Sequence, residues 1–127
     1  METIVVAYDD TEPAKRALRR AAELAEKLGA RLVVTSVTAV DETSYGDSEL
    51  EELAHARALL DAEGVEAEYQ AAIGEPADAI VEVAERHGAD LIVVGTRDPG
   101  AVQRMLGYSV SQGVLRQARC NVLVVRR

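Results

Sequence analysis

The sequence is poor in the features that would cross-link the chain or attract a polyanion. It has 127 residues and a single cysteine, Cys120, so no disulfide can form within it, and a secreted framework of disulfides is excluded. Lys and Arg together number 14 against 22 Asp and Glu. The resulting net charge of −8 argues against a protein that binds nucleic acid or an anionic membrane.

Long apolar runs are also absent. No apolar stretch approaches the roughly 20 residues that a membrane-spanning helix needs. The N-terminal METIVVAYDD has no basic segment, and its apolar run is too short for a signal peptide. We therefore expect a soluble, cytoplasmic protein and, from the length, a single domain over residues 1–127. Cys120 is interpreted as a small core side chain, because no neighbouring group in the sequence would stabilise a thiolate.

The chain does contain a regular alternation of short apolar runs and helical patterns. Apolar runs typical of strands buried on both faces occur at residues 4–8, 32–37, 91–94 and 122–125. Residues 65–73 instead alternate between apolar and mostly polar side chains, which predicts an edge strand with one wet face. Helical spacing predicts helices over 13–28, 49–63 and 76–87 and a fourth that begins near Ser109, the first three followed by Gly29, Gly64 and Gly88.

This order of elements predicts an α/β fold. Strands that alternate with helices of this length require right-handed crossovers and a mainly parallel sheet that is covered on both faces. Ligands bind such sheets beyond the carboxyl ends of the strands, where the direction of winding reverses. If the first and fourth strands are neighbours there, Asp9 and Gly95 face each other across a crevice.

The segment from Leu91 to Val125 is the most informative for function. A buried strand that ends at Gly95 is followed by a loop and by a helix that starts near Ser109. Unpaired N–H groups and the helix dipole make such an arrangement favourable for a phosphate. Asp98 and Tyr108 lie within this segment, and neither side chain suits a phosphate cradle.

Three segments carry a family resemblance: IVVAYDDTEPAKRAL, GEPADAIVEVAERHGADLIVVGTR and SVSQGVLRQARCNVLVV. With them the chain resembles the universal stress protein family over essentially its full length. The resemblance implies a three-layer α/β/α fold with a five-stranded parallel sheet in the order 3-2-1-4-5, the adenine nucleotide α-hydrolase-like arrangement. It also implies homodimers paired through the last strand, with an interface formed by Val122, Leu123, Val124 and Val125.

The ATP-binding branch of this family carries a glycine, two residues, a second glycine, nine residues and then glycine followed by serine or threonine. In unbroken register, the first glycine is Gly95, the second falls on Asp98, the third falls on Tyr108, and the serine is Ser109. Two of the three glycines are therefore replaced. The resemblance implies a degenerate nucleotide site with Asp9 and Val37 on its adenine and ribose side, and the full candidate set is Asp9, Val37, Gly95, Thr96, Arg97, Ser109 and Val110.

The replaced glycines decide how this site is interpreted. Glycine is needed where the backbone must approach a phosphate closely. A carboxylate at Asp98 about 5 Å from one phosphate charge costs about 3 kcal/mol at an effective dielectric near 20, which corresponds to roughly two decades of affinity. Mg²⁺ between Asp98 and the phosphates would reverse this effect, and Arg97 would offset it. We therefore expect no tight ATP binding, and ATP with Mg²⁺ remains the alternative.

The acidic pair Asp9 and Asp10 has another possible role. Phosphate-receiving response-regulator domains hold Mg²⁺ with such a pair, but they also need an acceptor aspartate after the third strand and a lysine after the fifth. Here Ile73 and Gly74 end the third strand, and no lysine follows Lys27. This alternative is disfavoured, and Asp10 is at least as well explained as a cap or turn residue.

The remaining polar residues give little evidence of catalysis. His55 and His87 are far apart in the sequence and have no cysteine partner, while Ser109 and Ser111 have no credible base and are interpreted as an N-cap and a surface residue. The acidic cluster at 49–52 is interpreted as a solvated first helical turn. We predict a non-enzymatic stress-response protein that forms a homodimer and acts by binding a small ligand or an unidentified protein partner. The alternatives are an ATP-binding regulator with at most very slow hydrolysis and, disfavoured, a nucleotide hydrolase.

Overall fold

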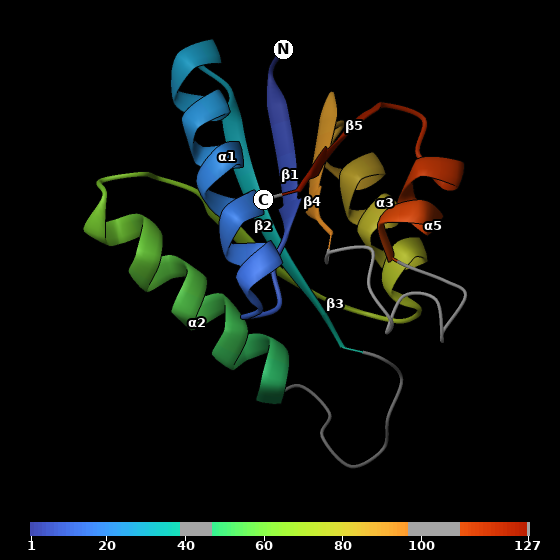
Figure 1. Cartoon of the computed structure of the whole chain (residues 1–127), viewed down its shortest axis with the longest axis horizontal. Coiled ribbons are helices and arrows are strands. Elements are labelled where there is room, and N and C mark those ends of the chain that lie inside the picture. Colours follow the sequence, from blue (N-terminus) through green and yellow to red (C-terminus); the bar gives the residue numbers. More distant parts are fainter. Residues whose placement is uncertain (39–46, 97–109, 127) are drawn as a thin grey trace.

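Five parallel strands form the centre of the structure (Figure 1). The computed structural model describes residues 1–38, 47–96 and 110–126, and the side chains of residues 47–50 are outside this description. The strands are β1 (Thr3–Ala7), β2 (Arg31–Thr38), β3 (Glu68–Ile73), β4 (Leu91–Gly95) and β5 (Asn121–Val125). They pair in the order β3-β2-β1-β4-β5, and every pairing is parallel, which confirms the predicted fold class.

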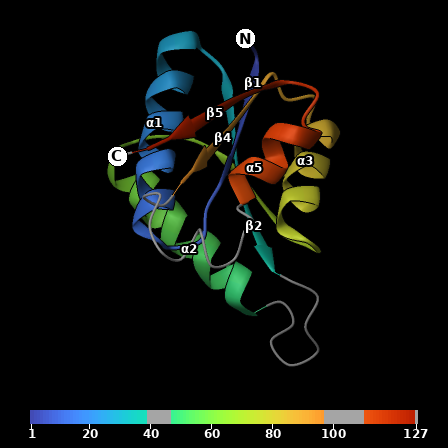
Figure 2. The same cartoon turned by 45° about the vertical axis from the view of Figure 1, so that its right-hand side comes forward.

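Helices cover both faces of the sheet. They are α1 (Glu12–Leu28), α2 (Asp47–Ala62), α3 (Pro76–Arg86) and α5 (Val110–Gln117). Figures 1 and 2 show α1 and α2 on one face and α3 and α5 on the other. Side chains alternate along each strand, so Val6 of β1 joins the core under α1 and α2 while Val5 joins the core under α3 and α5. Both valines are fully buried, as the continuous apolar run in β1 predicts.

Local signals in the sequence fix where α1 begins and ends. The Thr11 hydroxyl caps the helix by accepting a hydrogen bond from the Ala14 N–H group at 3.2 Å. Pro13 occupies the first turn, where no N–H donor is required. At the other end Gly29 adopts a left-handed conformation with φ of 65° and donates its N–H to the Ala25 carbonyl. These contacts confirm the predicted boundaries and place the start of α1 directly after β1.

The predicted edge strand exists, but only the first part of the face expected to be buried packs against the core. β3 lies at one edge of the sheet and begins at Glu68, three residues later than the alternation suggested. Tyr69 packs against the core under α1 and α2, whereas Ala71 is exposed and Ile73 is 43% exposed. The expectation of burial for these last two residues is wrong because that core stops short of them. Ala72 packs against the core on the opposite face.

The burial of Ser111 contradicts the sequence analysis, whereas that of Cys120 agrees with it. Ser111, predicted to lie on the surface, is instead buried. Cys120 is half-buried beside the core under α3 and α5, and it lines a hollow of about 120 Å³ there. Burial is the largest cause that raises the pKa of its thiol, which agrees with its interpretation as a packing residue. Among the helices of the described ranges, none is long and apolar enough to cross a membrane.

Candidate functional site

The carboxyl ends of β1 and β4 lie next to each other in the sheet. Their pairing joins Ile4 with Leu91 and Val6 with Val93, so the segments that follow these strands emerge at the same edge. β2 and β3 lie on one side of this pair and β5 on the other, which makes this the point where the winding reverses. We call this region the β1/β4 edge. It carries Asp9 after β1 and Gly95 at the end of β4, as the sequence predicts.

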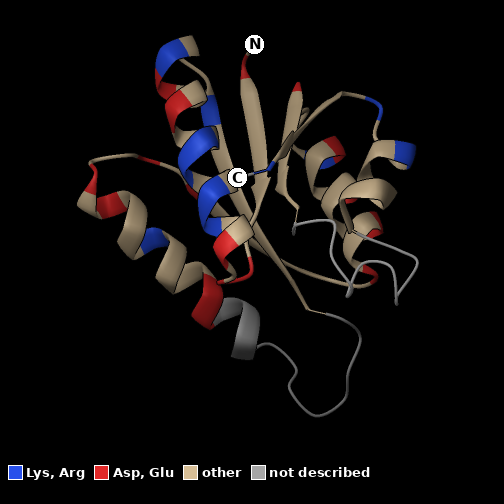
Figure 3. Cartoon of the chain, viewed as in Figure 1, with Lys and Arg blue, Asp and Glu red and all other residues tan. Residues whose placement is uncertain are grey.

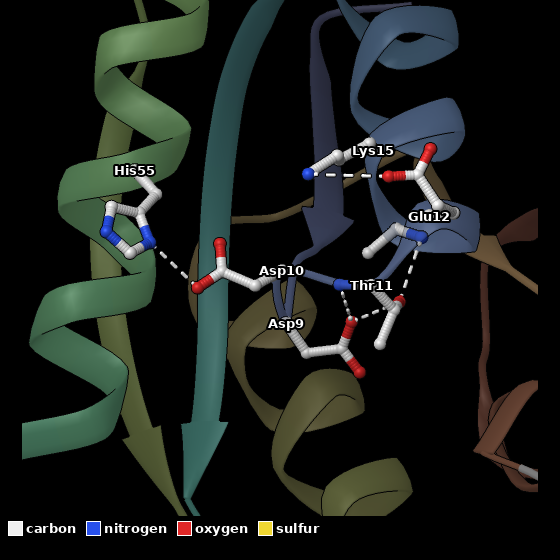
Figure 4. A network of polar contacts seen from close by, with 7 residues as sticks. Asp9, Asp10, Thr11, Glu12, Lys15 and His55 are labelled. Atoms are coloured by element: carbon white, nitrogen blue, oxygen red, sulfur yellow. Dashed lines mark hydrogen bonds and ion pairs between the residues drawn. The ribbon is translucent and has the colours of Figure 1, made fainter.

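A tight turn presents Asp9 at this edge. The Asp9 Oδ1 atom accepts hydrogen bonds from the Thr11 N–H at 3.2 Å and from the Thr11 hydroxyl at 2.6 Å (Figure 4). The side chain is exposed, and its Oδ2 atom has no partner among the residues described. The turn therefore holds the carboxylate in a fixed direction, and its Oδ2 atom, unpaired within the described part of the chain, is able to accept a hydrogen bond from a ligand.

An apolar contribution to the same edge comes from β2. Val37 is half-buried and packs against the core under α3 and α5, together with Ala7 at the end of β1. Both residues thus lie on the α3 and α5 side near the carboxyl ends of neighbouring strands. Their placement gives the β1/β4 edge an apolar flank beside the Asp9 carboxylate.

Gly95 is required by the packing of the fold itself. A Cβ atom at this position would lie 2.3 Å from the Pro13 carbonyl oxygen and 2.6 Å from the Pro13 carbonyl carbon. Real Cβ atoms essentially never approach backbone so closely, so β4 can meet the first turn of α1 only without a side chain here. The glycine that the sequence suggests for a phosphate is thus already needed by the contact between β4 and α1.

The other predicted phosphate-side residues are only partly described. The Thr96 N–H donates to the Val125 carbonyl at 3.1 Å, so Thr96 continues the pairing of β4 with β5. Val110 begins α5 and is 37% exposed. The four remaining positions, Arg97, Asp98, Tyr108 and Ser109, lie outside the described residues.

A second group of polar residues lies on the α2 side of the same edge, and sequence reasoning missed it. The His55 Nδ1 atom of α2 lies 2.8 Å from the Asp10 Oδ2 atom (Figure 4). The hydrogen bond to Asp10 is the largest cause that raises the pKa of His55, and the charge of Asp10 adds to it. One turn earlier on α2, Glu52 accepts a hydrogen bond from the Ser36 hydroxyl of β2. The expectation that Glu52 belongs to a solvated cluster is therefore wrong.

Tyr8 completes this polar group. It is only 2% exposed, and its hydroxyl has no partner at hydrogen-bonding geometry within the described chain. Burial is the main cause that raises the pKa of the phenol, and the neighbouring Asp10 carboxylate raises it further. Within the described ranges, no cluster of three or more His, Cys, Asp or Glu side chains is arranged to hold a metal ion.

Comparison with known proteins identifies the family. The sequence pattern of the universal stress protein family matches residues 1–126. The chain belongs to this family. A universal stress protein from Thermus aquaticus is 40% identical over 136 residues, and the match covers 98% of each chain.

Solved structures of universal stress proteins share the fold. One of them, in complex with cAMP, superimposes with a TM-score of 0.78 at 26% identity, and the match covers 98% of this chain and 96% of that one. Another, from Archaeoglobus fulgidus in complex with dAMP, has a TM-score of 0.72 at 28% identity and covers 98% and 97% of the two chains. These relatives are universal stress proteins of the same three-layer architecture, with an adenine nucleotide bound.

Proposed function

We propose that this universal stress protein is a non-catalytic, cytoplasmic binding module that works as a homodimer and prefers an adenine nucleotide with a short phosphate group to ATP. The proposal rests on a contrast between the nucleoside side of the candidate site, where the expected residue types are present, and its phosphate side, where two motif glycines are replaced. Asp9 and Val37, which we expect to meet the adenine and ribose, lie near the carboxyl ends of the neighbouring strands β1 and β2. The motif positions expected to meet the outer phosphates carry Asp98 and Tyr108 instead of glycine.

The nucleoside part of the site has suitable chemistry. The Oδ2 atom of Asp9, which has no partner among the residues described, can accept a hydrogen bond from a ribose hydroxyl or from an adenine amino group. Val37 and Ala7 offer apolar surface beside it for one face of a base. Two solved relatives hold cAMP and dAMP, which share adenine and a single phosphate. These points support an adenosine monophosphate as the class of ligand.

The phosphate part of the site is less favourable for a triphosphate. A carboxylate about 5 Å from an added phosphate charge costs about 3 kcal/mol at an effective dielectric near 20. By its position in the motif, Asp98 would supply such a carboxylate, and Tyr108 stands where the motif has glycine. The glycine at position 95 is no evidence for a phosphate site, because the contact with Pro13 requires a glycine there in any case. A ligand with fewer phosphate charges avoids most of this repulsion.

A non-catalytic role agrees with how the candidate acid and base groups are placed. Ser111 is buried, and the His55 ring is directed to Asp10 on the α2 side of the edge. A nucleophile activated by a neighbouring base would need the two side chains within hydrogen-bonding distance. No serine and histidine are bonded in this way among the residues described, which supports binding over turnover.

The homodimer is proposed from the free edge of the sheet. Among the residues that the structure describes, β5 pairs with β4 on one side only, and no described strand pairs with the backbone N–H and C=O groups on its other side. The residues proposed for the interface are apolar and only half-buried in the single chain: Val122, Leu123, Val124 and Val125. Antiparallel pairing of two such strands would satisfy the backbone groups and cover these side chains.

Calorimetric titration with AMP and with Mg-ATP tests the ligand preference. We expect AMP to bind at least about tenfold more tightly than Mg-ATP, because the repulsion at Asp98 is worth up to roughly two decades. The double variant Asp98→Gly with Tyr108→Gly should raise ATP affinity toward that of AMP. Adenosine carries no phosphate and serves as the internal control, so its affinity should not change.

The same titration decides between the proposal and its alternative. Tighter binding of Mg-ATP than of AMP by the unmodified protein would favour an ATP-binding regulator, in which Mg²⁺ or Arg97 offsets the carboxylate. Absence of binding for all three ligands would reject an adenine nucleotide site. Steady release of ADP from ATP would contradict the non-catalytic role.

A further inference from the structure

The turn between β1 and α1 is held from two sides by neighbouring carboxylates. Asp9 bonds to Thr11 at the start of α1, whereas Asp10 is directed away from it toward His55 on α2 (Figure 4). Asp10 is also the only residue other than glycine with a positive φ, 65°, in the described part of the chain. This left-handed conformation is sparsely populated for residues with a side chain and persists where surrounding contacts hold it.

The contact with His55 comes from an anchored part of α2. Leu53 and Ala56, on either side of His55 in the sequence, are buried in the core under α1 and α2. Glu52 is bonded to the Ser36 hydroxyl of β2 on the same stretch of the helix. The imidazole is therefore presented to Asp10 by a segment that is fixed to the sheet by both apolar and polar contacts.

We propose that His55 is a positioning residue for the ligand site: its ion pair with Asp10 holds the β1–α1 turn, and through the turn it sets the direction of the Asp9 carboxylate. The part of this inference that concerns ligand affinity rests on the proposed function, whereas the effect of His55 on the turn does not. His55 lies on the α2 side of the sheet, so it acts through the backbone of Asp10 and touches no ligand itself. Ligand affinity is then highest when His55 is protonated.

The charges around His55 fix the direction of the pH dependence. Glu51 and Glu52 on its own helix and Asp10 on the turn all raise the pKa of the imidazole, Asp10 most strongly. On α1, Lys15 and Glu12 pair with each other at 3.4 Å, so they largely cancel. Tyr8, directly after β1, stays neutral because burial and Asp10 raise its pKa, and Asp9 adds one more negative charge in the turn. The ion pair is complete below the raised pKa of His55 and is lost as the pH rises through it.

Nuclear magnetic resonance tests the coupling without any ligand. The chain has two histidines, and His87 on the far side of the sheet bonds to Gln70, which makes it a matched reference. We expect the backbone amides of Asp9, Asp10 and Thr11 to shift with pH at the midpoint of the His55 imidazole and not at that of His87. Amides of the turn that do not follow His55 would overturn the proposal.

Binding of cAMP at a series of pH values tests the effect on the site. The phosphodiester of cAMP keeps a single charge across the range, whereas the second ionisation of AMP falls near pH 6 and would confuse the result. We expect affinity to fall about two- to fivefold from about pH 5.5 to pH 8.5, the range that a partly exposed ion pair allows.

Four variants separate charge from structure in that experiment. His55→Lys keeps a positive charge and should bind cAMP with high affinity at every pH, while His55→Gln and Asp10→Asn should bind with a lower affinity that does not change with pH. His87→Gln should keep the pH dependence of the unmodified protein. An unchanged pH dependence in His55→Gln would overturn the proposal. If cAMP does not bind at all, the proposed ligand is wrong, and the amide titration still decides whether His55 holds the turn.

Discussion

Replacement of Gly95 by alanine tests the packing between β4 and α1. The new Cβ atom would lie 2.3 Å from the Pro13 carbonyl oxygen, about 1 Å short of an ordinary contact. The obstacle is backbone in the first turn of a helix whose start is fixed by the Thr11 cap, so it cannot turn aside as a flexible side chain would. Overpacking of this kind typically costs 1–3 kcal/mol, and because β4 is an inner strand and the obstacle is backbone we expect about 3 kcal/mol.

Thermal and urea unfolding measure this loss. For a domain of this size, 1 kcal/mol lowers the Tm by about 3–4 °C, so Gly95→Ala should lower it by about 10 °C. Gly29→Ala is the matched control, because nothing lies within 4 Å of its Cβ while its φ of 65° is strained for alanine. That strain alone costs about 1 kcal/mol, so the control should lose about a third as much stability.

The result also separates two explanations of this glycine. A Tm for Gly95→Ala that stays within about 2 °C of the unmodified protein would refute the packing argument, since a rigid contact cannot be relieved at so small a cost. If such a variant also lost nucleotide binding, the glycine would be required by the ligand and not by Pro13. Loss of stability at saturating ligand, with affinity nearly unchanged in the folded fraction, would support the packing explanation.

Three further predictions follow from single contacts. Val124→Asp places a charge in the middle of the proposed β5 interface and should give a monomer by sedimentation equilibrium, whereas a persistent dimer would reject that interface. Asp90 accepts hydrogen bonds from the N–H groups of Glu2 and Thr3 at 2.8 and 3.0 Å, which lower its pKa, so its stabilisation is present above pH 3.8 and is lost as the pH falls through the lowered value. The difference in urea midpoint between the unmodified protein and Asp90→Asn should therefore become smaller in acid. A difference that does not change with pH would show that the ionised Asp90 carboxylate is not the source of the stabilisation. Burial raises the pKa of the Cys120 thiol, so it should react with an aromatic disulfide at neutral pH several times more slowly than a free thiol such as glutathione, and an equal rate would show that the thiol is not shielded.

Much of the fold could be predicted from the sequence because its signals are local. Thr11, Pro13 and Gly29 act within one turn of their own position, so they mark the ends of α1 without knowledge of the rest of the chain. The continuous apolar run of β1 indicates a strand that is buried on both faces, and the alternation of β3 indicates its place at the edge of the sheet. The sheet order, in contrast, came from the family resemblance, because the pairing partners of a strand leave no mark in its own sequence.

The polar contacts could not be predicted because they join residues that are distant in sequence. His55 and Asp10 are 45 positions apart, and a helical pattern shows which side of α2 is buried but not what faces the imidazole. The pairing of Glu52 with Ser36 is hidden in the same way. Alternation in β3 also cannot show how far a helix extends over the strand, which is why the exposure of Ile73 was missed.

The contact between Gly95 and Pro13 changes what a motif glycine can indicate. A glycine at the end of β4 has two independent causes, close packing against the first turn of α1 and close approach to a phosphate, and the first acts whether or not a ligand binds. Its presence therefore does not distinguish a working phosphate site from a degenerate one. Positions 98 and 108 lie outside the described residues, and the family motif expects glycine at both, so the proposal about phosphate depends on the side chains of Asp98 and Tyr108. In our proposal the Asp98 carboxylate repels each added phosphate charge and leaves the contacts with adenine unchanged. The comparison of AMP with ATP therefore tests the proposal more directly than the affinity for either ligand alone.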